Sequence, residues 1–402
     1  MMCQPVKHAS TPKMDHYAVD HHAVDRHAVD LHALIQLIHE SPTQIVLAAT
    51  GGGSLAVSDL LTMPGASRTL IDALVPYSSG SLSAFLEFEP PQQCSVETAR
   101  QMAVRAFEQA QERQPDAPTA GVACTASLVS DRQKRGEHRL HVAVQSEQLT
   151  SVASLVLHKG ARDRTAEERI AADVILNQVA KACGLAERLA LDLREDEQVQ
   201  VDELRPPQSW QDLLAANSRL AASGPYDPAA PPRIVYPGAF HPIHAAHRGI
   251  AAYALAHCEG PLAYEISIVN PDKPTLDFLD MGDRAAQFAA DELLLFTRAA
   301  TFAEKAELFP GALFLVGADT IARIDDPRYY DHCREFRDEA VAALAAGGCR
   351  FLVFGREVEG RFTQLSDLSL GEGLRQRCKQ VPGEEFRMDV SSTKIRTEVG
   401  DG

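Results

Sequence analysis

Positive charge is in short supply in this 402-residue sequence, where 39 lysine and arginine residues stand against 55 acidic ones and leave a net charge of −16. Broad nucleic-acid binding depends on basic surface, so the composition excludes that class of partner. No apolar run is long enough to cross a bilayer, and no signal-peptide segment is recognisable. We therefore expect a cytoplasmic protein without nucleic-acid or membrane partners.

Closely spaced cysteines are also missing. The eight cysteines are far apart and form no Cys-x-x-Cys motif, which argues against a disulfide framework and against a common kind of zinc site. No metal site built from protein side chains is predicted. Hydrophobic residues make up 45% of the chain, as in globular proteins, and 402 residues exceed what one core usually serves. Two domains are expected.

Residues 1–33 stand apart through a five-residue repeat, because the segment 22–26 (HAVDR) is followed by 27–31 (HAVDL). A duplicated and poorly ordered tail is the preferred interpretation, since termini tolerate such insertions. Metal binding by this His-rich segment is the alternative.

The rest of the chain predicts two α/β domains joined by a linker. Residues 34–204 form the first domain, and residues 205–232 form a proline-rich linker in which a helix over 209–222 precedes the prolines. Residues 233–402 form the second domain. Its alternating strands and helices predict a parallel sheet, with ligands bound outside the carboxyl ends of the strands.

The functional prediction rests on the segment 235–247. An apolar run predicts a buried strand, a glycine turn follows at Gly238, and a helix is expected to begin near Pro242. His244 and His247 would then share one helix face. A helix N-terminus with two imidazoles suits phosphate, because backbone N–H groups and the helix dipole face the anion. The alternatives are ordinary surface histidines or half of a zinc site that lacks its third ligand.

This segment resembles the nucleotidyltransferase superfamily that carries the HxGH signature. The match involves Gly238, Phe240, Pro242, His244 and His247, with Ala246 where the signature usually has glycine. The resemblance implies a Rossmann-like domain in which the two histidines bind the α and β phosphates of a nucleoside triphosphate. It also places Gly238 and Phe240 in the nucleotide-binding site.

A second segment near the end of the chain has hydroxyls that can cap a helix and bind phosphate, followed by two cationic side chains. It resembles the ISSTxxR phosphate loop of the same superfamily, with Val390 in place of isoleucine. An ordinary helix start is the alternative. The residues implied in triphosphate binding are Ser391, Ser392, Thr393, Lys394 and Arg396.

Two further phrases resemble bacterial nicotinate mononucleotide adenylyltransferases. One is the segment 271–274 (PDKP) followed by Arg284, where Asp272 replaces the family's histidine, and the other is 317–320 (GADT) after a strand. The resemblance implies that Lys273 and Arg284 bind the acceptor and that Asp319 lies in the nucleotide site. The alternatives are a solvated loop for Lys273 and a helix cap for Asp319. The segment 284–296 is expected to be a helix.

Together these resemblances imply transfer of AMP from ATP to nicotinate or nicotinamide mononucleotide with release of pyrophosphate. Mg²⁺ bound mainly through phosphate oxygens is the expected cofactor. One alternative is a cytidylyltransferase that uses CTP and a phosphorylated alcohol, and another is a regulator that binds nucleotides without turnover. A homo-oligomer is compatible with the sequence.

The first domain also has a glycine-rich turn, over residues 50–54 (TGGGS), between an expected strand and helix. Such a turn lets the backbone approach a phosphate or carboxylate. Farther along, the segment 165–168 (TAEE) is expected to be a capping box that starts another helix.

This domain resembles the C-terminal domain of the CinA family, an α/β sandwich whose members include nicotinamide mononucleotide deamidases. The resemblance rests on the segments 63–67, 77–78, 95–99 and 121–122. The family's Glu-Ser-Cys-Thr-Gly-Gly turn is changed, so that Thr50 takes the place of the nucleophile and Ala49 that of the acid. Thr50 and Ser54 mark the candidate site. We interpret the domain as a non-catalytic binding or scaffolding copy, with active deamidation as the alternative.

Overall fold

The computed structural model describes residues 28–387, except 133, 134, 225, 271–273, 359 and 360. The predicted tail up to residue 27, the acceptor candidate Lys273 and the segment 391–396 lie outside the described residues. Across the part of the chain that is described, no helix is both long and apolar enough to cross a bilayer.

The chain divides into two compact units whose boundaries differ from the predicted domains. The first unit extends to Ala215 and also includes Asn270–Gly282, whereas the second unit contains Ala216–Val269 and the chain from Asp283 onward. The prediction of one continuous second domain from residue 233 therefore needs correction. A segment from the middle of that range packs with the first unit.

The expected linker 205–232 also needs correction, because it contains the helix α6 (Gln208–Leu214) and the strand β7 (Leu220–Ser223). Trp210 is 2% exposed, so α6 belongs to a core. The predicted helix over 209–222 ends early because residues 220–223 pair with a strand of the second unit's sheet. The helix α1 (Leu31–Glu40) begins at Leu31, so its first three residues lie inside the range expected to be tail.

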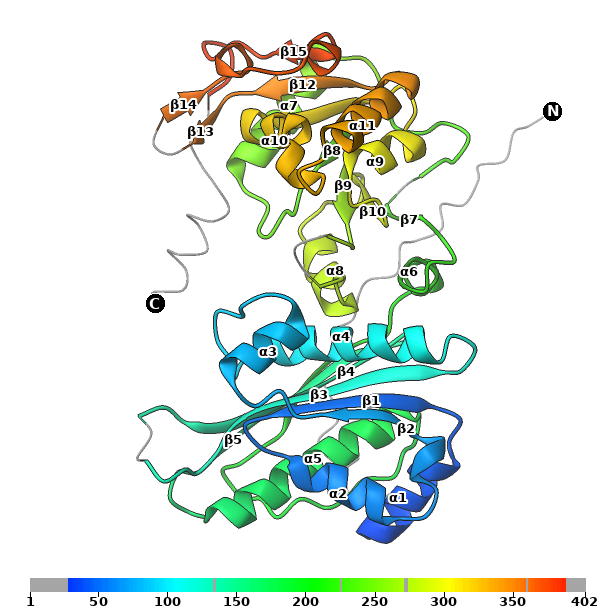
Figure 1. Ribbon diagram of the computed structural model, residues 1–402, viewed down its shortest axis with the longest axis vertical. Helices are drawn as coiled ribbons and strands as arrows, with labels where there is room; N and C mark the ends of the chain where they lie inside the picture. Colours follow the sequence, from blue (N-terminus) through cyan, green and yellow to red (C-terminus); the bar gives the residue numbers. More distant parts are fainter. Residues whose placement is uncertain (1–27, 133–134, 225, 271–273, 359–360, 388–402) are drawn as a thin grey trace, which may run out of the picture. The chain divides into compact units, whose positions relative to one another are not determined.

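Within the described residues, the first unit contains one six-stranded sheet between two helix layers (Figure 1). The strand order is β2-β1-β3-β4-β5-β6, parallel from β2 to β3 and antiparallel from β3 to β6. The strands are β1 (Gln44–Thr50), β2 (Leu70–Leu74), β3 (Thr119–Ser127), β4 (His138–Ser146), β5 (Thr150–Leu157) and β6 (Gln200–Leu204). The other helices are α2 (Ser54–Thr62), α3 (Ser79–Leu86), α4 (Val96–Arg113) and α5 (Arg164–Ala182).

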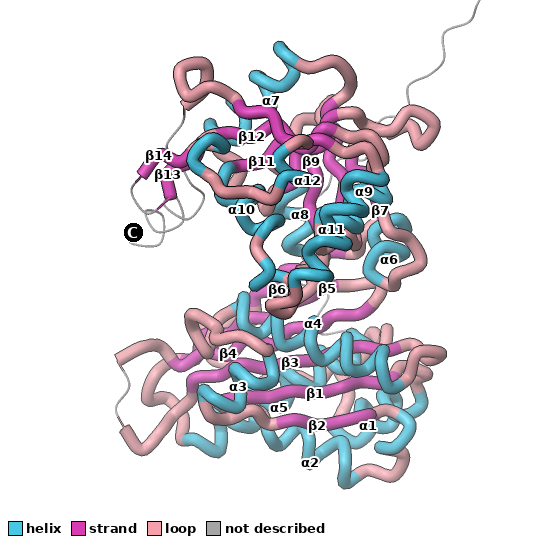
Figure 2. Tube along the Cα trace, turned by 45° about the horizontal axis from the view of Figure 1, so that its top comes forward, coloured by secondary structure: helices cyan, strands magenta, loops and turns pink. Residues whose placement is uncertain are grey.

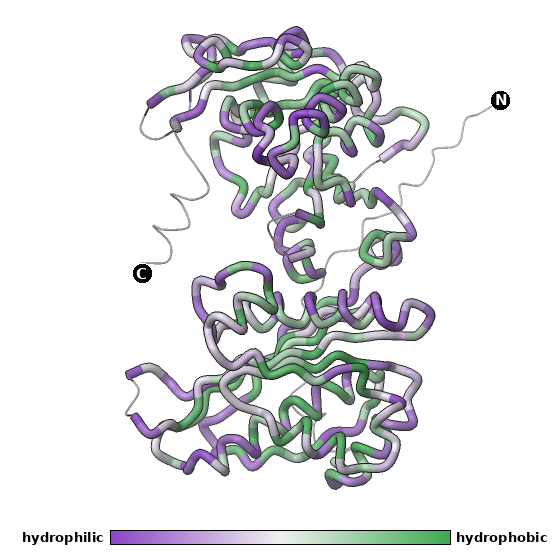
Figure 3. The backbone as a smooth tube through the Cα atoms, in the orientation of Figure 1, coloured by the Kyte–Doolittle hydropathy of each residue, from purple (hydrophilic) through white to green (hydrophobic). Residues whose placement is uncertain are grey.

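Alternation along the strands separates the two core layers of this unit. Leu47 points to the layer formed by α1, α2 and α5, where it packs with residues such as Ile175. Its neighbour Ala48 points to the opposite layer, where Met102 of α4 lies. Figure 3 shows the central strands as the most hydrophobic parts of the unit.

The second unit contains a seven-stranded sheet in the order β15-β12-β11-β8-β9-β10-β7, with helices alternating between strands along the chain (Figure 2). Its further strands are β8 (Ile234–Pro237), β9 (Leu262–Ser267), β10 (Leu293–Thr297), β11 (Leu313–Gly317), β12 (Arg350–Phe354) and β15 (Cys378–Gln380), and β13 (Arg356–Val358) and β14 (Arg361–Thr363) form a separate hairpin. The helices that follow β8 are α7 (Ala245–His257), α9 (Phe302–Leu308), α10 (Ala318–Asp325), α11 (Arg334–Ala346) and α12 (Glu372–Arg375). The helix α8 (Phe278–Ala285) crosses the boundary, because its residues up to Gly282 belong to the first unit.

The predicted parallel sheet is correct for six strands and wrong for β7, which pairs antiparallel with β10 at the edge. The strands β9 and β10 are added on one side of β8, and β11, β12 and β15 on the other. This order creates a topological switch point between β8 and β11. In such sheets the crevice outside the carboxyl ends at the switch point is the usual ligand site.

The predicted helix over 284–296 is wrong. The helix α8 ends at Ala285, and the apolar run that follows becomes β10. Four of the five residues of β10 are buried, and a short apolar run of this kind gives no periodicity that separates a buried strand from a buried helix.

Candidate functional site

The strand β8 carries the predicted histidine segment to the carboxyl edge of the second unit's sheet. Its residues Val235 and Tyr236 are 0% and 5% exposed. Because both sides of the strand are buried, β8 takes an interior position between β11 and β9. The turn after β8 therefore opens at the switch point.

Gly238 and Phe240 shape that turn. The Gly238 N–H donates to the carbonyl of Glu265 at 3.0 Å. The Phe240 ring folds over Gly238, where an added Cβ would lie 2.7 Å from the ring, so only glycine fits. Phe240 itself is 1% exposed and packs edge-on against Tyr236 and Phe288. Both residues were predicted to bind nucleotide, and the structure gives the Phe240 ring a place in the core.

Gln287 fixes the same turn from outside the predicted motif. Its side-chain oxygen accepts from the Ile243 N–H at 2.8 Å, and its amide donates to the Phe240 carbonyl at 3.0 Å. These two bonds hold the chain in front of the histidine helix. Gln287 was not predicted, because a glutamine 40 residues from the motif carries no local signal.

The helix α7 begins at Ala245, three residues later than predicted. Pro242 lies in the preceding turn, with a cis peptide bond to His241, and not in the first helical turn. His244 is the N-cap residue but makes no side-chain cap hydrogen bond within the described residues. The first two amides of α7 therefore remain available to an anion, while the third faces the His244 ring.

His244 and His247 are brought together as predicted, with stacked rings whose centroids are 3.7 Å apart. The His244 N–H donates to Nδ1 of His247 at 3.2 Å, so a neutral His247 carries its proton on Nε2. Both ring nitrogens of His244 are buried and have no hydrogen-bond partner within the described residues. Such atoms are rare in native proteins and mark a place where a ligand would form the hydrogen bond.

The two imidazoles are held neutral. Burial, with His244, Arg356 and Arg248 nearby, lowers the pKa of His247 to about 3. Burial and the charge of Arg356 also lower the pKa of His244. At neutral pH the rings are therefore hydrogen-bonding groups, and Arg356 brings positive charge close to them.

Arg356 and Asp319 complete the site from two further strands. Asp319 lies in the first turn of α10, directly after β11, and Arg356 follows β12. The Arg356 Nε and Asp319 Oδ1 atoms are 3.8 Å apart, and both side chains are about one-third exposed, at 30% and 33%. That oxygen makes no hydrogen bond within the described residues. The pair is therefore loose enough for either group to turn to a ligand.

Asp319 was among the predicted residues, whereas Arg356 was not. The signal for Arg356 was its position, since an arginine directly after an apolar strand lies at the carboxyl edge of a parallel sheet. Arg284, predicted for the acceptor, lies in the last turn of α8, three residues before Gln287.

The predicted residues Ser391, Ser392, Thr393, Lys394, Arg396 and Lys273 lie outside the described residues. The last described residue before this segment is Arg387. Its guanidinium lies 4.5 Å from the ring centroid of Phe362 in β14. Because β15 runs parallel to β12, the chain leaves β15 at the carboxyl edge, where the histidine pair also lies.

No group of three or more His, Cys, Asp or Glu side chains in the described part of the chain is arranged to hold a metal ion. Of the four side chains that converge here, Asp319 alone offers a carboxylate. Any divalent ion at this edge would therefore need most of its oxygen ligands from a substrate.

In the first unit, the turn over 50–54 joins β1 to α2, but an internal carboxylate already occupies the helix N-terminus. Glu168 accepts from the Ser54 hydroxyl at 2.9 Å and from the Leu55 N–H at 3.4 Å. Arg164 also donates to Glu168, at 3.2 Å. The Ser54 hydroxyl and the Leu55 N–H, which belong to the region expected to face a ligand, thus bind the carboxylate of Glu168.

Glu168 came from the segment predicted as a capping box, and that prediction is wrong. The N-cap of α5 is Asp163, whose side chain accepts from the Ala166 N–H. Glu168 and Glu167 turn inward instead, and Glu167 is fully buried against His138, 2.7 Å away. Helix periodicity puts these carboxylates on the core side, which local capping rules do not consider.

The charge state of Glu168 bears on Ser54. Burial alone would raise the pKa of this carboxyl, but hydrogen bonds from the Gly53 N–H and from Ser54, with the charge of Arg164, hold it below its usual value. A carboxylate with a lowered pKa is a weak base, so it gives Ser54 little activation. Thr50, the other candidate, is 8% exposed at the end of β1.

No protein-family model matches the chain, and no curated protein matches it. Among solved structures, it is similar to CinA-superfamily proteins. One, a CinA superfamily protein from Escherichia coli, has 17% identity and a TM-score of 0.31, over 38% of this chain and 90% of that one. The competence/damage inducible protein CihA from Agrobacterium tumefaciens has 19% identity and a TM-score of 0.29, over 39% and 94%. A CinA superfamily protein from Enterobacter cloacae has 13% identity and a TM-score of 0.29, over 46% and 95%.

The chain is thus structurally similar to CinA-superfamily proteins over about 40% of its length. At these identities the likeness concerns the fold and carries no activity. None of these comparisons supports the nucleotidyltransferase resemblance, which remains a hypothesis based on the residues.

Proposed function

We propose that the second unit transfers a nucleotidyl group, AMP from ATP, to a phosphate monoester, nicotinate or nicotinamide mononucleotide, and releases pyrophosphate. The observation that carries this proposal is the meeting of four side chains at the carboxyl ends of three strands. His244 and His247 follow β8, Asp319 follows β11, and Arg356 follows β12. This is the edge at which sheets with this strand order bind ligands.

In the proposed reaction, an oxygen of the acceptor phosphate attacks the α-phosphorus of ATP. A new P–O bond forms while the bond to the bridging oxygen of the β-phosphate breaks, and pyrophosphate leaves with that electron pair. The acceptor is already anionic near pH 7, so the step needs no protein nucleophile or base. The protein instead positions two anions and stabilises the charge of the transition state.

The residues fit these tasks. His247 would donate from Nε2 to a phosphate oxygen, beside the free first amides of α7. His244 would do the same through its unpaired ring, and Arg356 would add charge. Mg²⁺, held chiefly by triphosphate oxygens, would neutralise part of the substrate charge. Ser391, Ser392, Thr393, Lys394 and Arg396 are proposed for the far end of the triphosphate, and Lys273 and Arg284 for the acceptor.

We also propose that the first unit does not deamidate nicotinamide mononucleotide. The support is Glu168, which fills the helix N-terminus at the turn over 50–54 and leaves Ser54 without a strong base. Thr50 has no better environment, since it is buried at the end of a strand.

The test is pyrophosphate release by the full chain with Mg²⁺, pairing ATP or CTP with nicotinate mononucleotide, nicotinamide mononucleotide or a phosphoalcohol. Release with ATP and a pyridine mononucleotide is expected. Release with CTP and the alcohol alone would instead make the protein a cytidylyltransferase. Nucleotide binding without pyrophosphate release in any pair would instead indicate a regulator that binds nucleotides without turnover. Ammonia from nicotinamide mononucleotide would overturn the non-catalytic first unit.

A further inference from the structure

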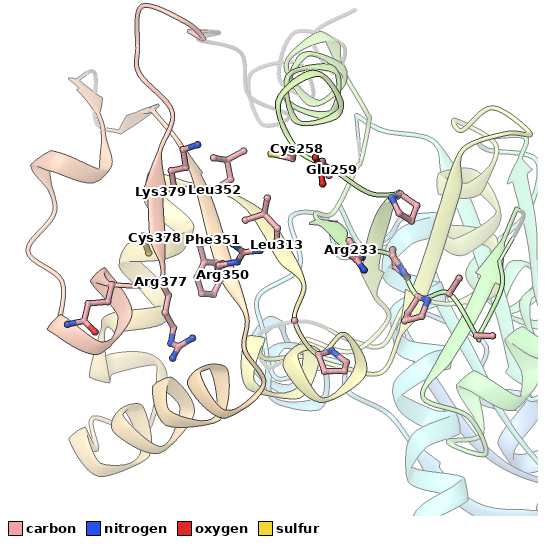
Figure 4. A pocket seen from close by; sticks show the side chains of 18 residues that line it. Arg233, Cys258, Glu259, Leu313, Arg350, Phe351, Leu352, Arg377, Cys378 and Lys379 are labelled. Atoms are coloured by element: carbon pink, nitrogen blue, oxygen red, sulfur yellow. The ribbon is translucent and has the colours of Figure 1, made fainter.

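The second unit has another concave region, at the opposite edge of its sheet. A cavity of about 1010 Å³ lies at the amino ends of β8, β11 and β12 and alongside β15, and the segment 229–233 and the loop after α7 close its other sides (Figure 4). The histidine site lies at the carboxyl ends of the same strands. Strands of four or five residues span roughly 15 Å, so the two sites are separate.

This amino-edge pocket is rich in positive charge. Arg233, Arg350, Arg377 and Lys379 line it, and Glu259 is its single acidic lining residue. Figure 4 shows Arg350, Arg377 and Lys379 on the side formed by β12 and β15, with Arg233 across from them. In a chain of net charge −16, four cations around one cavity are a strong local excess.

Most of these cations are not neutralised by the protein. Within the described residues, no ion pair joins Arg233, Arg350 or Lys379 to a carboxylate. Arg377 donates through Nη1 to the Cys349 carbonyl at 3.2 Å, while its buried Nε has no hydrogen-bond partner in the described chain. Arg377 is therefore held in place and still has N–H donors that are not used. The side chains of Arg233, Arg350 and Lys379 are free to turn toward an anion.

Apart from Gln376, the remaining lining is mostly apolar. Leu313, Phe351 and Leu352 come from the strands, and Pro231 and Pro232 from the segment that precedes β8. A cation-rich rim over apolar side chains suits a ligand with an organic part and a multiply charged group. The volume lies at the upper end of the range for small-molecule sites.

We propose that the amino-edge pocket binds a small phosphate-bearing molecule, at a site distinct from that of the proposed nucleotidyl transfer. Phosphate fits better than a single carboxylate, because three arginines and a lysine from separate segments offer more donors and charge than one carboxylate uses. The proposal does not depend on the activity of the histidine site.

The experiment is a calorimetric titration of the full chain with inorganic pyrophosphate at low ionic strength. Because pyrophosphate is also expected at the histidine site, the titration is made in a His247→Ala background. One variant adds Arg350→Gln and Lys379→Gln. The matched control adds Arg334→Gln and Arg361→Gln, which remove the same charge from exposed positions that do not line the pocket. Circular dichroism checks that each variant is folded.

The expected result is a binding event that persists in His247→Ala, weakens by about tenfold or more in the pocket variant, and stays unchanged in the control. Absence of binding in the His247→Ala background would overturn the proposal. So would an equal loss in the pocket variant and the control, since the effect would then be one of net charge. Failure of nucleotidyl transfer would leave this result unaffected, so the two proposals can fail separately.

Discussion

At His247, one side chain serves both the fold and the candidate site. Its Nδ1 accepts from the His244 backbone, which fixes the start of α7, and its Nε2 is left to donate. We expect His247→Ala to lower kcat about 100- to 1000-fold, as loss of a donor to a transition-state anion does elsewhere. The measurement is pyrophosphate release with ATP and the accepted mononucleotide.

The matched control is His257→Ala at the other end of α7, where an exposed ring stacks on Tyr253. Its kcat should stay within about threefold of the original, because the site lies at the opposite helix end. Similar losses in both variants would show that α7 had been disturbed as a whole, and a normal kcat in His247→Ala would remove the residue from the mechanism.

The same histidine predicts a pH dependence of stability. Its pKa is lowered to about 3 in the folded state, against about 6.5 in an unfolded chain. The unfolded state therefore binds the proton more tightly, and stability that is fully present above pH 6.5 is lost as the pH falls toward 3. Between pH 7 and 5 this group should account for about 1–2 kcal/mol of lost stability, allowing for its partial exposure.

Hydrogen exchange of the α7 amides at the two pH values, corrected for intrinsic rates, measures that loss. In His247→Gln the drop from pH 7 to 5 should be smaller, because the titrating group is gone. An unchanged drop would assign the pH dependence to other groups.

At the scale of elements, the strand–turn–helix unit at β8 could be predicted from local patterns, while its details could not. The apolar run and the glycine gave a strand and a turn in the right places. The helix start was missed by three residues, because Phe240 folds back over Gly238 and Gln287 holds the turn. Both contacts depend on residues that only the tertiary fold brings together.

The glycine-rich turn of the first unit gives an element-scale prediction. Gly51 has a φ of +79°, and an added Cβ would lie 1.9 Å from the Ala126 carbonyl oxygen on β3. Gly51→Ala should therefore destabilise the first unit by about 3 kcal/mol or more, since strain and a backbone clash act together. Urea unfolding followed by the fluorescence of Trp210, the single tryptophan, measures this unit.

Gly160→Ala is the control, because Gly160 has a similar φ of +82° but nothing within 4 Å of an added Cβ. It should cost only the strain, about 1 kcal/mol. Equal costs for the two substitutions would mean that the turn moves away from β3 without penalty.

At the scale of the whole molecule, the segment Asn270–Gly282 leaves the sequence range of the second domain and packs in the first unit. Arg100 of α4 donates from Nε to Asp277 at 2.7 Å and pairs with it through a second nitrogen. The Phe278 N–H donates to the Thr150 hydroxyl at 3.0 Å. A cut at the predicted linker would therefore remove part of the first unit's core.

Arg100→Met tests this organisation, because it leaves the Asp277 carboxylate, whose side chain is 4% exposed, without its cation. We expect the first unit to lose about 3–5 kcal/mol in Trp210-detected urea unfolding. The control is Arg113→Met on the same helix, whose exposed pair with Asp72 spans 3.7 Å and should contribute less than about 1 kcal/mol. A small effect of Arg100→Met would mean that the segment contributes little to this unit.

The sequence by itself determined the α/β class, the division into two parts, and the pairing of His244 and His247 after a buried strand. These features depend on apolar runs, glycine turns and short spacings, which act over a few residues. Only the tertiary structure decided that Arg356 and Asp319, which follow separate strands, lie close together, and that Glu168 occupies the turn of the first unit. It also decided that the segment Asn270–Gly282 packs with the first unit. Each of these depends on strand order and burial between residues far apart in the chain, which local patterns do not encode.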